Sequence, residues 1–171
     1  MRSLIVMLAL VFSSPALGQS MPVADMSVDG FIEALSPKAQ GLTRGLTLQP
    51  LEAGEDAPLP SIDLAVGFDF GSNQLTIEAR ALLSNLAAAL ESSPLESRSF
   101  QLAGHTDAIG THEANDRLSL ERARAVRDFL VETHGIAPER LSILGLGKRQ
   151  LLFPDRPDDG ANRRVEISLQ P

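Results

Sequence analysis

The stretch Phe-Gln-Leu-Ala-Gly-His-Thr-Asp at residues 100–107 decides how the rest of the chain is interpreted. From Phe100 to Gly104, every second residue is apolar or small, a period of two that predicts a half-buried strand. The strand runs directly into the polar His-Thr-Asp sequence that ends at Asp107. Polar side chains are therefore expected to collect where this strand ends.

Periodic segments on both sides of this strand predict the order of the fold. They are a strand at 62–70, a helix at 76–90, a longer helix at 112–134, and strands at 141–144 and 165–169. Thr111 is the expected N-cap of the longer helix, and Gly135 is its expected C-cap. The order β-α-β-α-β-β predicts an α/β (α+β) two-layer sandwich, a mixed sheet with helices on one face.

The helix at 112–134 places polar residues where a core is expected. At about 100° per residue, its core-facing stripe comprises Thr111, Asn115, Leu118, Arg122, Ala125, Val126 and Phe129. A buried guanidinium costs free energy unless a carboxylate or a ligand anion compensates it. A second cation, Arg163, is expected on the buried face of the last strand, whereas Arg164 is expected on the opposite face.

Two interpretations of these charges follow from the spacing. Asp107, Arg122, Asn115 and Arg163 suit a ligand that carries an ammonium and a carboxylate close together, because guanidinium groups bind carboxylates through paired hydrogen bonds. Alternatively, Asp107 and Arg122 form an internal salt bridge that only closes the loop. Spacing alone leaves both interpretations open.

A series of motifs in fixed order closely resembles the OmpA-like C-terminal domain family over residues 62–170. The motifs are Gly104-His105-Thr106-Asp107, Gly110, Asn115, Leu118-Ser119, Arg122-Ala123, Gly145-Leu146-Gly147 and Asn162-Arg163-Arg164-Val165-Glu166-Ile167, with Phe68-Asp69-Phe70-Gly71-Ser72 fitting the first strand. The resemblance implies non-covalent binding of peptidoglycan through the diaminopimelate of its stem peptide, with no catalysis and no cofactor.

The same resemblance assigns roles to individual residues. It implies that Asp107 binds the ammonium of diaminopimelate and that Arg122 binds its carboxylate. Gly71 matches a position of the family that contributes main-chain atoms. Three further positions match ligand contacts of the family: Thr106, Asn115 and Arg163. Because these include the residues that the helical arithmetic found out of place, the resemblance favours the ligand over the internal salt bridge.

The residues before the domain have a different composition. Residues 1–18 read as a secretory signal peptide, with Arg2, an apolar run and small residues before the expected cut, although an uncleaved anchor is an alternative. Residues 19–60 predict one short helix, with Ser27 as N-cap, followed by a flexible linker, and residues 61–171 form the domain. We expect an exported protein of the bacterial periplasm, associated with the outer membrane or cell wall, with no integral membrane segment after cleavage.

Composition excludes several other classes. Twenty-two acidic residues against 15 basic ones give a net charge of −7, which disfavours nucleic acid as a partner. Cysteine is absent, so disulfides, thiolate metal sites, cysteine catalysis and a lipidated N-terminal cysteine are excluded.

Two rival functions remain to be weighed. A metal centre at residues 105–116 is disfavoured because the spacing does not require a third ligand to lie close to the others. Gly145–Lys148 is predicted to be a turn with a solvated lysine. A protein–protein adaptor that docks an envelope protein through residues 27–48 is the alternative function.

Overall fold

The computed structural model describes residues 22–37, 59–68 and 72–171. The predicted signal peptide at 1–18, most of the predicted linker and Gly71 lie outside these ranges. Among the described residues, no helix combines the length and apolarity needed to cross a membrane.

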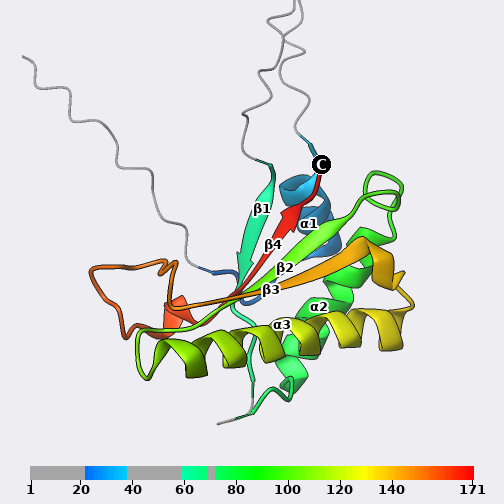
Figure 1. Ribbon diagram of the computed structural model, residues 1–171. Helices are drawn as coiled ribbons and strands as arrows, with labels where there is room; N and C mark the ends of the chain where they lie inside the picture. Colours follow the sequence, from blue (N-terminus) through cyan, green and yellow to red (C-terminus); the bar gives the residue numbers. More distant parts are fainter. Residues whose placement is uncertain (1–21, 38–58, 69–71) are drawn as a thin grey trace, which may run out of the picture.

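Four strands form one mixed sheet (Figure 1). They are β1 (Ser61–Leu64), β2 (Phe100–His105), β3 (Leu141–Gly147) and β4 (Val165–Leu169). The spatial order is β1-β4-β2-β3, in which β2 and β3 run parallel and the other pairs run antiparallel. The predicted mixed sheet is thus confirmed, with β4 inserted between β1 and β2.

The predicted helices are present with their expected caps. They are α2 (Ile77–Leu90) and α3 (His112–His134), preceded by α1 (Val28–Leu35), and short 3₁₀ turns η1 (Pro138–Arg140) and η2 (Gly160–Asn162) precede β3 and β4. Thr111 Oγ accepts the N–H of Ala114 at the start of α3, and Gly135 ends that helix at φ +73°. Helices cover one face of the sheet, which confirms the predicted two-layer architecture (Figure 1).

The short helix α1 belongs to the same hydrophobic core as the sheet. Its N-cap is Ser27, and its apolar residues Phe31 and Leu35 are fully buried. The Asn85 side chain of α2 donates to the Met26 carbonyl at 2.9 Å, which fixes the segment before α1. Residues 22–37 are therefore packed against the domain rather than separate from it.

The first strand is shorter than its alternation predicts. β1 ends at Leu64, which pairs with Val165, the first residue of β4. Beyond that point β1 has no partner strand, and the chain turns, so that Phe68 makes only an isolated bridge with Leu75. The predicted strand at 62–70 is wrong over residues 65–68 because its neighbour ends there, and positions 69 and 70 lie outside the described residues.

Glycines bring the backbone of α3 against the sheet. A Cβ atom added to Gly104 of β2 would lie 2.1 Å from the backbone carbonyl oxygen of Ser119. A Cβ atom added to Gly145 of β3 would lie 2.8 Å from the backbone carbonyl oxygen of Asp116. Residues 145–147 of the turn predicted at 145–148 are instead the end of β3, and the turn begins only at Lys148. The glycines of β3 serve close packing rather than a change of direction.

This close packing rotates α3 from its predicted orientation. Its buried residues are Asn115, Ser119, Ala123, Val126 and Leu130. Small side chains face the glycines, so the predicted stripe through Leu118, Arg122 and Phe129 lies at the half-buried flank of the helix. Arg122 is therefore beside the core rather than in it.

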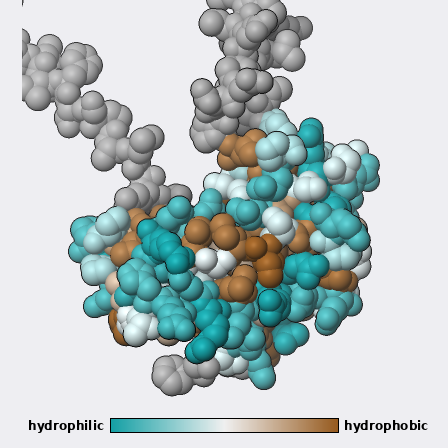
Figure 2. Space-filling view, viewed as in Figure 1, coloured by the Kyte–Doolittle hydropathy of each residue, from teal (hydrophilic) through white to brown (hydrophobic). Residues whose placement is uncertain are grey.

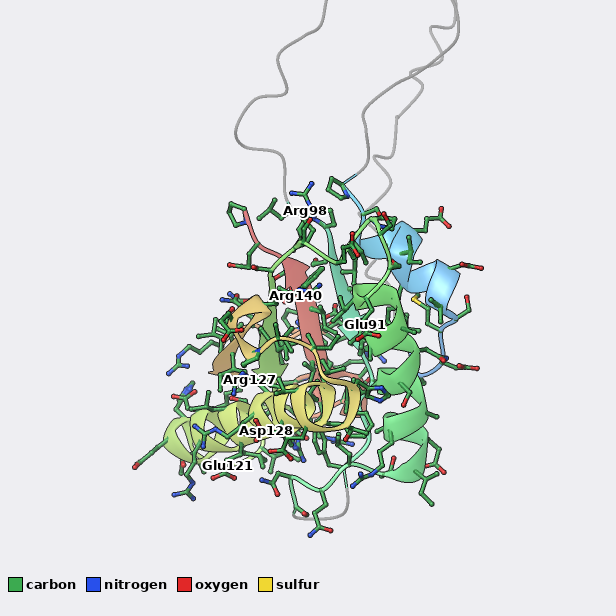
Figure 3. All side chains as sticks on the ribbon, turned by 90° about the vertical axis from the view of Figure 1, so that its right-hand side faces the viewer. Glu91, Arg98, Glu121, Arg127, Asp128 and Arg140 are labelled. Carbon is green, nitrogen blue, oxygen red and sulfur yellow. The ribbon has the colours of Figure 1, made fainter. Side chains whose placement is uncertain are left out.

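Arg140 closes the end of α2 (Figure 3). Its guanidinium donates to the carbonyls of Leu90 and Leu95, each at 2.8 Å, and of Arg98 at 2.9 Å. Leu90 is the last residue of α2, and its carbonyl has no partner within the helix. Burial lowers the pKa of Arg140, and the nearby carboxylates of Glu91 and Glu96 act in the opposite direction.

The surface over β3 is apolar (Figure 2). Leu144, at the middle of this edge strand, is 39% exposed. Leu120, Ile143 and Leu144 line a shallow pocket there, with Arg117 and Arg149 among its charged neighbours.

The glycine contact predicts a sharp steric effect. We expect Gly104→Ala to lower the free energy of unfolding by about 1–3 kcal/mol or more, because the added methyl meets backbone atoms that cannot rotate away. Urea unfolding measures the difference. Gln101→Ala, on the same strand but the other face, is the control, and equal stabilities of the two variants would contradict the proposed contact.

Candidate functional site

An open pocket lies beside the start of β4. Its walls come from the chain after β1, from α3 and from the turn before β4. The lining residues are Ala65, Val66, Gly67, Phe68, Arg122, Gly160 and Arg163. Two of the predicted site residues, Arg122 and Arg163, therefore face one cavity.

Arg122 is held in this pocket without a carboxylate partner among the described residues. Its guanidinium lies over the ring of Phe68, 5.0 Å from the ring centre. Its Nε is buried and finds no hydrogen-bond acceptor in the described part of the chain. Burial, and secondarily the charge of Arg163, lower the pKa of Arg122. An anion in the pocket would relieve both effects.

Asp107 pairs with Arg163 instead of Arg122. Arg163 donates to Asp107 Oδ2 at 2.8 Å, so the alternative internal bridge from Asp107 to Arg122 is not formed. Arg163 lies before β4 rather than within it, and its side chain is 49% exposed. Its predicted place on the buried face of the strand is wrong because β4 begins only at Val165.

The neighbouring Arg164 is the buried arginine of the pair. It is 8% exposed, pairs with Asp63 of β1 and donates to the Gln150 carbonyl. The sequence pattern predicts that Arg164 lies on the face of the strand away from the core, but it does not predict that the Arg164 side chain is buried. Its partner Asp63 lies on a strand 101 residues away.

Thr106 and Asn115 lie behind the pocket and hold the loop that carries Asp107. Both are buried, at 2% and 5% exposure. Thr106 Oγ1 donates to the Asp107 carbonyl, and Asn115 Nδ2 donates to the Ile109 carbonyl, each at 2.9 Å. The Ile109 N–H in turn donates to Asp107 Oδ1 at 3.2 Å. These contacts fix the carboxylate that pairs with Arg163.

Two further residues shape the site although the sequence analysis assigned them no role in it. Phe68 provides the ring beneath Arg122. Asn162, fully buried, accepts from the Phe153 N–H and donates to the carbonyls of Arg156 and Pro157. The sequence signals are the motifs of the family resemblance, which include both residues, and the position of Asn162 directly before the two arginines.

His105 makes a close contact with Glu166 next to the loop. Its side chain is inaccessible to solvent, and its Nε2 lies 3.4 Å from Glu166 Oε2. The nearby His105 lowers the pKa of Glu166. His105 therefore joins β2 to β4. Within the described residues, no three His, Asp or Glu side chains gather as metal ligands.

The chain matches one protein-family model and several curated proteins of the outer membrane. The OmpA family model matches residues 67–164. Outer membrane porin F of Pseudomonas aeruginosa is 30% identical over 154 residues, which cover 87% of this chain and 43% of the porin. Outer membrane protein A of Bordetella avium is 38% identical over 104 residues, covering 60% of this chain and 52% of that protein. The chain thus spans about half or less of these relatives' length.

Solved structures show the same fold. The peptidoglycan-associated lipoprotein from Burkholderia pseudomallei is 34% identical with a TM-score of 0.52, over 61% of this chain and 88% of that one.

The contact between His105 and Glu166 predicts a pH-dependent contribution to stability. A carboxyl group whose pKa is lowered by folding stabilises the native state above its ordinary pKa of 4.5, and this contribution disappears as the pH falls through the lowered value. We expect Glu166→Gln to cost about 1 kcal/mol of unfolding free energy at neutral pH, since the group is half-exposed. Towards pH 3 the variant and the wild type should converge.

Urea unfolding at pH 7 and at several values below 4.5 measures this difference. The exposed Glu132→Gln on α3 controls for the loss of one carboxylate at neutral pH. A gap between Glu166→Gln and wild type that stays constant to pH 3 would argue against the contact.

Proposed function

Since the chain belongs to the OmpA family, we propose that it binds peptidoglycan non-covalently, through the diaminopimelate of the stem peptide. The observation that carries this proposal is Arg122, a half-buried arginine whose buried Nε has no acceptor among the described residues, in a pocket that also exposes Arg163. Two cations facing one cavity repel each other, so the pocket suits an anionic group.

The neighbouring carboxylate extends the match to a zwitterion. Asp107 pairs with Arg163, which lines the pocket, and its carboxylate can accept an ammonium. Arg122 and Arg163 can then bind the carboxylate attached to the same carbon. Diaminopimelate carries both groups on one carbon at each end, which matches this spacing of charges.

The other proposed site residues divide by accessibility. Thr106 and Asn115 are buried and act through the loop that they hold, so we assign them to positioning rather than to direct contact. Gly71 remains a proposed main-chain contact. Gly71 comes three positions after Phe68 in the sequence, and the guanidinium of Arg122 lies over the Phe68 ring.

The cellular setting follows from the same proposal. A protein exported by the predicted signal peptide at 1–18 would meet peptidoglycan in the periplasm of a Gram-negative bacterium and contribute to envelope anchoring or integrity. We propose binding without catalysis and without a cofactor. The similar protein from Burkholderia pseudomallei, a peptidoglycan-associated lipoprotein, supports this setting.

The alternative adaptor function loses part of its proposed surface. Within the described part of the segment, residues 27–37, Phe31 and Leu35 are fully buried and already packed into the core of the domain. An adaptor would therefore have to use other residues of that segment.

Peptidoglycan binding is tested by co-sedimentation of the purified chain with diaminopimelate-containing cell wall. We expect Arg122→Ala and Asp107→Ala each to weaken binding roughly tenfold to a hundredfold, the range for a lost charged hydrogen bond. The affinity of Arg122→Lys should lie between those of the wild type and Arg122→Ala, because an ammonium keeps the charge but not the paired donors. Free meso-diaminopimelate should release the wild type from the pellet.

The controls separate the ligand from general charge effects. Arg124→Ala removes an exposed arginine from the same helix and should pellet like the wild type. Because the chain has neither Trp nor Tyr, the bound fraction is measured on stained gels. Wild-type pelleting by both site variants would refute the site assignment, and a wild type that stays in the supernatant would refute the function.

A further inference from the structure

The loop that carries Asp107 has all four of its carbonyls bound by side chains. From Asp107 to Gly110, each backbone carbonyl accepts one hydrogen bond from Thr106, Asn115 or Lys148. Lys148 makes two of these four bonds, to the carbonyl of residue 108 at 3.2 Å and to that of Gly110 at 2.7 Å. The predicted solvated lysine is therefore a half-buried clamp on the loop.

Lys148 is itself held firmly by the sheet. It follows Gly147, the last residue of β3, whose φ of +53° suits glycine. The Gly147 N–H donates to Ser119 Oγ, and its carbonyl accepts the Thr106 N–H, both at 2.9 Å. The ammonium thus extends from a rigid strand end across to the loop.

The two clamped carbonyls flank the residue that orients the carboxylate. Ala108 and Gly110 lie on either side of Ile109, whose N–H donates to Asp107 Oδ1. Charge-assisted hydrogen bonds are the stronger ones, and a single ammonium that bridges two carbonyls fixes their separation. The position of the Asp107 carboxylate therefore depends on Lys148.

We propose that Lys148 is a positioning residue for ligand binding: it holds the 107–110 loop so that the Asp107 carboxylate faces the ligand's ammonium. This inference rests on the proposed function. Lys148 acts through the loop, since its ammonium donates to two of the loop carbonyls. The charge is also directed into the loop rather than towards the pocket, which Lys148 does not line.

The test compares Lys148→Met, Lys148→Arg and Arg149→Met with the wild-type chain. Arg149 is adjacent, but its guanidinium pairs with Asp116, away from the loop carbonyls. Two quantities are measured: binding to diaminopimelate-containing cell wall, and amide hydrogen exchange of Ile109, which needs no ligand. Thermal unfolding checks that each variant is folded.

We expect Lys148→Met to bind the wall roughly tenfold more weakly and to exchange the Ile109 amide faster. Lys148→Arg, which keeps a charged donor of similar reach, should restore most of both properties, and Arg149→Met should change neither. If Lys148→Met does not fold, Lys148→Gln supplies the same comparison with a shorter, uncharged side chain.

Three results would overturn the inference. In the first, Lys148→Met binds like the wild type. In the second, it binds more weakly while exchange at Ile109 is unchanged, which would make Lys148 a direct ligand contact. In the third, Lys148→Arg restores neither property. A wild type that does not bind the wall would refute the proposed function instead, and faster exchange at Ile109 in Lys148→Met would still support the clamp.

Discussion

The close approach of α3 to β2 and β3 is the constraint on which the site depends. Gly104 and Gly145 leave no room for a Cβ atom between the strands and the helix backbone, and Ser119 lies at the closest point. This contact fixes the rotation of α3 about its axis. Arg122, three residues after Ser119, consequently points to the flank, into the pocket above Phe68. A helix held one methyl group farther away would carry its arginine away from the pocket.

The charges of the site leave one of the two pocket arginines without a carboxylate partner among the described residues. Asp107 satisfies one arginine, Arg163, and leaves Arg122 beside an aromatic ring and a like charge. Arg164, by contrast, is buried against Asp63 and two neighbouring strands. Of the adjacent residues Arg163 and Arg164, Arg164 therefore stabilises the fold and Arg163 faces the pocket. Net charge alone, negative for the whole chain, conceals this local excess of positive charge.

Periodicity predicted the elements well and the contacts between them poorly. The order of strands and helices, and the caps Thr111 and Gly135, depend on local sequence and were confirmed. The orientation of α3 depends on glycines of two strands that are distant in sequence, so a helical stripe could not reveal it. The same holds for the length of β1, which is set by where β4 begins.

At the candidate site, too, the sequence predicts individual residues better than the contacts between them. Charge in unexpected places identifies Asp107, Arg122 and Arg163, and in the structure the two arginines line one pocket while Asp107 pairs with Arg163. This pairing differs from the internal salt bridge that was the alternative interpretation, because the partner of Asp107 comes from a loop 56 residues later in the chain. Lys148 was misjudged for the same reason: the carbonyls that it binds lie about 40 residues earlier.

One backbone contact near the N-terminus gives the fold a mechanical property. Val23 donates to the Asp63 carbonyl at 2.8 Å and accepts the Ala65 N–H at 2.9 Å, so it is attached to the end of β1. Ala65 also lines the pocket. A force that pulls on the chain before residue 22 is therefore delivered to the wall of the pocket through two hydrogen bonds. Ala65 therefore belongs both to the N-terminal contact and to the wall of the pocket.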